Sequence, residues 1–135
     1  MDKHDNNTLY LNTLKVIINL GRFKIYHKLC KFLDFFYKIA FTDNESISLV
    51  VAECLGKLLA VDLEKHVKQI KRKMKDESKS CRRTMAASMK YLVSPKTLDI
   101  FEFTLLNPFI ALLKDSDLEV KKQAFISLTK VCNQF

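Results

Sequence analysis

The sequence predicts an all-α fold, a right-handed solenoid of stacked helical hairpins. Apolar residues step by four, four and three positions in three separate stretches, and this spacing places side chains on one face of an α-helix. The three stripes are Ile47, Val51, Leu55 and Leu58; Cys81, Met85, Met89 and Leu92; and Val120, Ala124, Leu128 and Val131. Each stripe follows an acidic or polar turn, and the unit of helix, turn and helix recurs at a period in the high thirties. Such a recurring two-helix unit is typical of an α-solenoid.

The composition agrees with helices around one sizeable core. Of the 135 residues, 48% are apolar, whereas only two are glycine and two are proline. The chain can therefore bury a core and contains few helix breakers. Its formal charge of +8 favours acidic partners, which include an acidic protein surface, nucleic acid and anionic lipid.

Cysteine usage and hydropathy predict where the protein works. Cys30, Cys54, Cys81 and Cys132 are far apart and form no CxxC motif, so we interpret them as small apolar residues in a reducing compartment. Polar residues interrupt every apolar stretch, and none offers the roughly 20 apolar residues that a membrane-spanning helix needs. The polar amino terminus is no secretory signal. The expected location is the cytoplasm, the nucleus or both, with no membrane as a partner.

In chain order, the sequence predicts one orphan helix and three hairpins in a single partial array over residues 1–135. Residues 8–20 form the orphan helix, whose partner in the repeat would precede the chain. The first repeat, residues 24–60, joins a strongly apolar helix at 24–41 to a second helix that begins near Glu45. A helix that is apolar around so much of its circumference is expected between two neighbours.

Two further repeats are predicted at residues 62–94 and 97–133. Asp62 is a suitable N-cap for the first helix of the second repeat. Pro108 lies within the first helix of the third repeat, where it either kinks that helix or marks its start with Asn107 as the cap. No polar capping helix is predicted at either end, and such uncapped ends predict self-association.

The last turn and helix resemble a known repeat. Residues Asp115–Ala124 place an acidic turn before a valine, a basic residue and, one turn later, a small residue, as the HEAT repeat does. Three stretches resemble, more specifically, the carboxyl-terminal part of the cullin-associated, neddylation-dissociated family, the exchange factor of cullin-RING ubiquitin ligases. These stretches are Leu9–Ile18, Val50–Leu58 and Leu112–Lys122.

The resemblance covers nearly the whole chain but only a small part of the long family protein. It implies a non-enzymatic scaffold that binds a cullin or a cullin-RING complex and regulates ubiquitin ligases. The chain departs from the family pattern at Ser48, which stands in place of an arginine, and at Lys121 and Lys122, which replace arginines. Residues 65–79 are also more basic than that pattern.

The densest positive charge gathers around the turn of the second repeat. One hypothesis is a platform for phosphates or for an acidic protein, with an affinity that falls as salt rises. The alternative is a solvated helix face without a partner. Aromatic residues are absent between these charges, which disfavours stacking of single-stranded nucleic acid. The candidate binding residues are Lys68, Lys71, Arg72, Lys75, Lys79, Arg82 and Arg83.

Acidic and basic residues recur at the same separation in two repeats, as Asp76 with Arg82 and as Asp115 with Lys121. Each acid lies at a turn, where it can accept hydrogen bonds from backbone amides or from a basic side chain of the neighbouring repeat. We expect these residues to form a structural ladder along the stack. The first repeat has Ser48 at the basic position, so the ladder is expected to be weakest there.

No constellation of residues points to catalysis or to metal binding. His27 and Cys30 are spaced to share a helix face as ligands, but no second pair completes a tetrahedral set. The chain has no glycine-rich phosphate loop, no HExxH motif and no nucleophile in a recognisable catalytic motif. We predict no enzyme activity, metal or cofactor. Two alternatives to cullin binding stay open: a basic HEAT module that binds nucleic acid, and a truncated solenoid without autonomous function.

Overall fold

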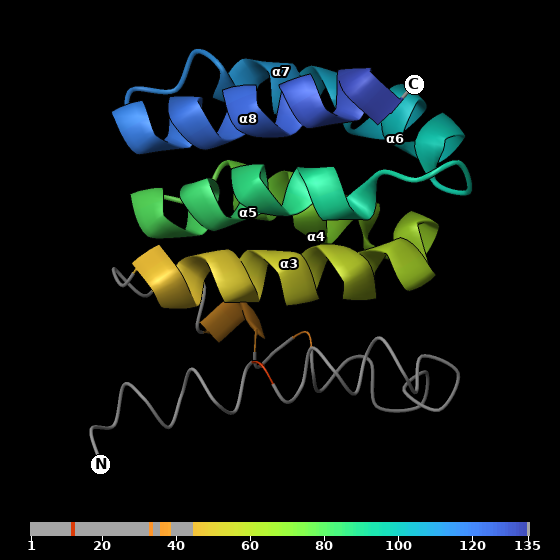
Figure 1. Cartoon of the computed structure of the whole chain (residues 1–135), viewed down its shortest axis with the longest axis horizontal. Coiled ribbons are helices and arrows are strands. Elements are labelled where there is room, and N and C mark those ends of the chain that lie inside the picture. The colour runs from red at the N-terminus through yellow and green to blue at the C-terminus, as the bar shows by residue number, and fades with distance from the viewer. Residues whose placement is uncertain (1–11, 13–32, 34–35, 39–44, 135) are drawn as a thin grey trace.

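The chain folds as a stack of α-helices. The structure is a computed structural model that describes residues 12, 33, 36–38 and 45–134. Within these residues every regular element is an α-helix, which confirms the predicted all-α class. The helices are α3 (Glu45–Val61), α4 (Leu63–Met74), α5 (Lys79–Leu92), α6 (Leu98–Thr104), α7 (Leu106–Leu112) and α8 (Leu118–Gln134) (Figure 1).

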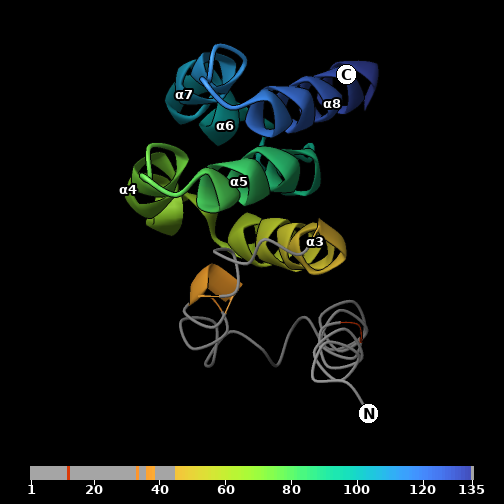
Figure 2. The ribbon, with the colours of Figure 1, turned by 90° about the vertical axis from the view of Figure 1, so that its left-hand side faces the viewer.

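The helices form two layers. In one layer α3, α5 and α8 lie side by side, and in the other α4 is followed by α6 and α7 (Figures 1 and 2). Successive hairpins therefore add to both layers along one axis. This arrangement is an α-solenoid.

The predicted apolar stripes form the core between the layers. All members of the stripes on α3 and α5 are buried, and on α8 only Leu128 is partly exposed while it packs against the core. Leu33 and Phe36, from the helix predicted at 24–41, are buried as well. Burial of one such large apolar side chain contributes about 1.5–3 kcal/mol to the free energy of unfolding, so these stripes hold the stack together.

Small residues allow the helices of the first layer to approach closely. A Cβ atom at Gly56 would lie 2.5 Å from the carbonyl oxygen of Ser88 and 2.7 Å from Cβ of Tyr91. Carbon atoms do not approach other heavy atoms so closely, so the spacing of α3 and α5 requires glycine here. Between α5 and α8, Ser127 donates a hydrogen bond of 2.7 Å to the carbonyl of Ala86.

Side chains in the turns mark where α5 and α8 begin. Ser78 accepts the amide of Cys81 at 3.3 Å, and Asp117 accepts the amide of Val120 at 3.1 Å. Asp62 occupies the predicted N-cap position of α4, but its side chain makes no capping hydrogen bond. Because this single residue connects α3 to α4, the connection constrains its backbone, which has φ −145° and ψ 69°.

The helix break in the third hairpin falls at Leu105. The helix α6 ends at Thr104 and α7 begins at Leu106, so Pro108 lies in the first turn of α7. Of the two alternatives left open for Pro108, a helix that starts there with Asn107 as its cap is therefore wrong. A proline ring clashes with the carbonyl four residues earlier, here that of Thr104, and this clash explains why the first helix stops there.

Part of the prediction concerns residues that the structure does not describe. The orphan helix at 8–20, most of the helix at 24–41, and the pair His27 and Cys30 lie outside the described residues. The boundaries of the repeats stay predictions.

Candidate protein-binding surfaces

Arg82 connects the turn before α5 to the turn before α8. Its Nε donates to Oδ2 of Asp115 at 2.9 Å, and its Nη2 donates to Oδ1 at 3.2 Å. Its Nη1 donates to the backbone carbonyls of Asp76 at 2.8 Å and Glu77 at 3.0 Å. One guanidinium therefore holds the turn of its own hairpin and the carboxylate of the next. The bidentate geometry fixes the relative orientation of the two hairpins.

The ion pair shifts the pKa values of both partners. The hydrogen bond with Asp115 raises the pKa of Arg82 above its ordinary value. Burial alone would raise the pKa of Asp115, but hydrogen bonds from Arg82 and from the amide of Asp117 lower it below its ordinary value. The two side chains are only 16% and 10% exposed, so water and salt screen this pair less than a surface pair.

The side chains of the other residues of the predicted ladder take no part in this ion pair. The carboxylate of Asp76 accepts a hydrogen bond from the amide of Ser78 at 2.8 Å. Arg82 donates to the backbone carbonyl of Asp76 and not to its carboxylate. Lys121 is exposed and forms no ion pair within the described part of the chain. Its charge contributes to the lowered pKa of Asp115 without a direct contact.

A neutral hydrogen bond connects α3 to α5. It involves Ser48, which takes the repeat position that Arg82 of the Arg82–Asp115 ion pair has in the next repeat. Oγ of Ser48 is 3.0 Å from Oγ1 of Thr84, and both side chains are buried. Thr84 donates its own proton to the carbonyl of Ser80 at 2.9 Å. Since one hydroxyl has a single proton to donate, Ser48 is the donor to Thr84.

The structure divides the predicted basic residues between two helices. At the start of α5, Lys79 is exposed and Arg83 is partly exposed, whereas Arg82 is engaged with Asp115. The remaining four are exposed at positions i, i+3, i+4 and i+7, on one side of α4 and of the residue that follows it. This basic face of α4 consists of Lys68, Lys71, Arg72 and Lys75.

A cluster of lysines around an aromatic ring lies where α5 and α8 meet. Nζ of Lys90 is 5.3 Å from the centre of the Tyr91 ring, and Nζ of Lys130 is 5.7 Å from it. Burial lowers the pKa of Lys90, and the charge of Lys130 lowers it further. Cations are attracted to the face of an aromatic ring, and tyrosine is frequent at the energetic centres of protein interfaces. We call these three residues the Tyr91 cluster.

The sequence alone did not predict the Tyr91 cluster. Tyr91 and Lys130 belong to successive hairpins and come together only when α5 and α8 stack. The available signal was the repeat period, which relates positions on these two helices. On the adjacent α3, Lys57 pairs with Glu53 at 3.1 Å, so charged side chains continue across the layer.

The described residues contain neither a metal-binding group nor a membrane-spanning helix. No three His, Cys, Asp or Glu side chains of the described part are grouped as metal ligands. None of the described helices combines the length and the apolar composition that crossing a bilayer requires.

Cys81 behaves as a structural residue. Its side chain is buried, and Sγ donates a long hydrogen bond of 3.8 Å to the carbonyl of Lys73. Burial raises the pKa of the thiol to about 11. At neutral pH it is therefore protonated and a poor nucleophile.

Three known proteins with similar sequences share one name. Cullin-associated NEDD8-dissociated protein 1 of Arabidopsis thaliana is 31% identical over 101 residues, which are 73% of this chain and 8% of that protein. The chain is a relative of the cullin-associated NEDD8-dissociated proteins. The protein of the same name from Drosophila melanogaster is 28% identical over 96 residues, 70% of this chain. That of Dictyostelium discoideum is 29% identical over 93 residues, 67% of this chain.

These similarities confirm the family resemblance predicted from the sequence. The chain spans about 8% of the length of the curated cullin-associated NEDD8-dissociated proteins that it matches. No family model matches the chain, and no solved structure matches it significantly.

Proposed function

We propose that the chain is a non-enzymatic HEAT-repeat scaffold that binds a cullin or a cullin-RING complex. The observation that supports this function is the similarity, over 73% of the chain, to a protein named for its association with cullins. A stack of hairpins suits this function because it presents side chains from successive repeats on one continuous face. The chain would then take part in the regulation of cullin-RING ubiquitin ligases, in the cytoplasm or the nucleus.

We place the contact on the layer of α3, α5 and α8, around the Tyr91 cluster. The partly exposed ring of Tyr91 offers apolar area, and Lys90 and Lys130 add positive charge beside it. This combination suits an acidic surface, since an aromatic centre supplies affinity and the charges favour the correct partner.

A pull-down with the purified chain and an unmodified cullin–RING-protein complex tests this proposal. We expect capture at moderate salt, and the substitution Tyr91→Ala is expected to weaken it about tenfold. The matched control is Phe103→Ala on α6, which removes a 91% exposed aromatic ring in the other layer. Failure of the unaltered chain to capture the complex, while a full-length relative succeeds, would contradict the proposal.

The basic face of α4 supports a second candidate function, the binding of nucleic acid. Four exposed cations on one side of a helix can neutralise phosphates, and such binding weakens steeply as salt rises. A duplex-DNA gel shift, run beside the pull-down, tests it. A shift that disappears at moderate salt and in the variant with alanine at all four positions, without cullin capture, favours this candidate. If both assays fail, a truncated solenoid without autonomous function is the better description, and self-association on a sizing column would accompany it.

A further inference from the structure

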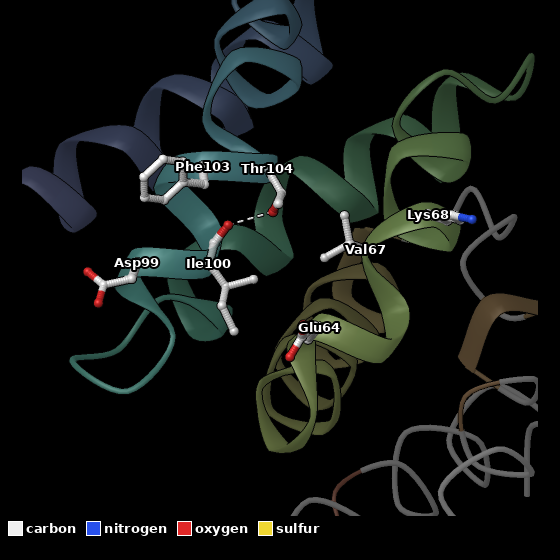
Figure 3. Close-up of a pocket in the computed structure, with 7 residues that line it drawn as sticks. All are labelled: Glu64, Val67, Lys68, Asp99, Ile100, Phe103 and Thr104. Atoms are coloured by element: carbon white, nitrogen blue, oxygen red, sulfur yellow. Dashed lines mark hydrogen bonds between the residues drawn. The ribbon is translucent and has the colours of Figure 1, made fainter.

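A groove of about 430 Å³ lies between α4 and α6, in the layer opposite to the Tyr91 cluster. Its lining side chains come from these two helices only (Figure 3). The proposed cullin contact uses none of them. They are Glu64, Val67 and Lys68 of α4, and Asp99, Ile100, Phe103 and Thr104 of α6.

Apolar side chains make up much of the groove. Val67 and Ile100 are partly buried and pack against the core, whereas Phe103 is 91% exposed. Residues two apart point to opposite sides of a helix, and Phe101 is buried against Phe109 with ring centres 5.9 Å apart. Phe103 must therefore face outward. A large aromatic ring this exposed beside other apolar residues is typical of a surface that a partner covers.

Two carboxylates lie at one end of the groove. Glu64 and Asp99 belong to the first turns of α4 and α6, and among the described residues neither forms an ion pair. Lys68 lies one turn farther along α4. In a chain of net charge +8, this end of the groove is a local acidic site beside an apolar one.

We propose that the groove binds a short segment of another protein that carries a bulky apolar residue next to a basic residue. The apolar side chain packs against Val67, Ile100 and Phe103, and the basic side chain reaches Glu64 and Asp99. Charge complementarity selects this occupant. A second copy of the chain would bring another charge of +8, and an acidic segment would be repelled by the two carboxylates.

The test uses the whole chain and two fluorescein-labelled peptides of equal length. Both peptides carry the same leucines. In one peptide lysines flank the leucines, and in the other glutamates flank them. Fluorescence anisotropy is expected to show that the lysine peptide binds about tenfold more tightly, although the net charge of the chain would by itself favour the glutamate peptide.

Matched variants then locate the site. The double variant Glu64→Gln and Asp99→Asn is expected to weaken binding of the lysine peptide about tenfold, whereas Glu102→Gln, an exposed acid of α6 outside the groove, is expected to change it less than about twofold. Phe103→Ser is expected to weaken binding about tenfold, and Phe125→Ser on α8 to leave it unchanged.

Three results would overturn the proposal. The first is equal or tighter binding of the glutamate peptide. The second is an effect of Glu102→Gln as large as that of the double variant. The third is a dimer in sedimentation velocity that Phe103→Ser dissociates, because the occupant would then be a second copy. Circular dichroism checks that each variant keeps its helices, and the cullin pull-down is expected to be unaffected by the substitutions in the groove, which are Glu64→Gln with Asp99→Asn and Phe103→Ser.

Discussion

The two junctions in the layer of α3, α5 and α8 are built differently. Between α3 and α5 the closest contact is at Gly56, and the polar link is a buried, neutral hydrogen bond from Ser48 to Thr84. Between α5 and α8, Arg82 forms a bidentate ion pair with Asp115 across the turns. The first junction thus depends on close approach of the backbones, and the second on a directed charge pair.

This difference indicates that one repeat architecture tolerates two kinds of link. The ion pair needs an arginine in the first turn of one helix and an acid in the turn before the helix of the next hairpin. The position of the arginine is taken by Ser48 in the first repeat, and Asp76 instead accepts the amide of Ser78 in its own turn. Each acid therefore has a donor, since Asp76 accepts the amide of Ser78 and Asp115 accepts Arg82.

The largest effect is expected at the close approach of α3 and α5. The substitution Gly56→Val would place side-chain atoms against the carbonyl oxygen of Ser88, where even a Cβ atom lies 2.5 Å away. Overpacking against backbone should lower the free energy of unfolding by about 3 kcal/mol. Urea denaturation measures the free energy of unfolding. The control for β-branching is Ala60→Val, because Ala60 is partly exposed and lies one turn later on α3. Equal effects of both substitutions would show that the junction is not tight.

The ion pair of the second junction should have a somewhat smaller effect. The substitution Asp115→Ala leaves the guanidinium of Arg82 mostly buried with only the carbonyls of Asp76 and Glu77 as acceptors. The expected loss in the free energy of unfolding is about 2 kcal/mol. Ser116→Ala, exposed in the same turn, is the control. A double-mutant cycle with Arg82→Gln should show coupling, and purely additive losses would mean that the pair contributes no specific energy.

The neutral link of the first junction should contribute less. Ser48→Ala removes the donor to Thr84, which keeps its own bond to the carbonyl of Ser80. The expected loss in the free energy of unfolding is about 1 kcal/mol. Ser46→Ala, exposed on the same helix, should change it by less than about 0.5 kcal/mol. A loss at Ser48 that exceeds the loss at Asp115 would reverse the proposed ranking of the two junctions.

The sequence predicted the helices better than the surfaces they carry. Periodicity identified the buried faces of α3 and α5, because burial follows directly from helical spacing. It missed the buried His66 of α4, since a pattern of apolar residues does not include histidine. Periodicity did not place the helix break at Leu105 either, because the effect of Pro108 is exerted on a carbonyl four residues earlier.

The surfaces depend on contacts between repeats, which sequence spacing describes poorly. The acid-to-base separation drew attention to Asp115 and Arg82, and each acid was expected to accept from backbone amides or from a basic side chain of the neighbouring repeat. Arg82 of one hairpin and Asp115 of the next form such a pair, but the spacing did not predict which acid and which base would meet. The groove beside Phe103 depends in the same way on how α4 and α6 pack.

A fall in pH is expected to lower the free energy of unfolding through the second junction but not through the first. This is the smallest of the predicted effects. Because the pKa of Asp115 is lowered in the folded chain, its contribution is present above the ordinary value of 3.8 and is lost as pH falls through the folded value. A protonated carboxyl still accepts a hydrogen bond from Arg82, so the loss should be smaller than that caused by Asp115→Ala. The stability difference between the unaltered chain and Asp115→Asn, measured by urea denaturation from neutral pH downward, should therefore shrink below about pH 4. The difference between the unaltered chain and Ser48→Ala should stay constant over the same range, because no ionisable group takes part in the Ser48–Thr84 bond.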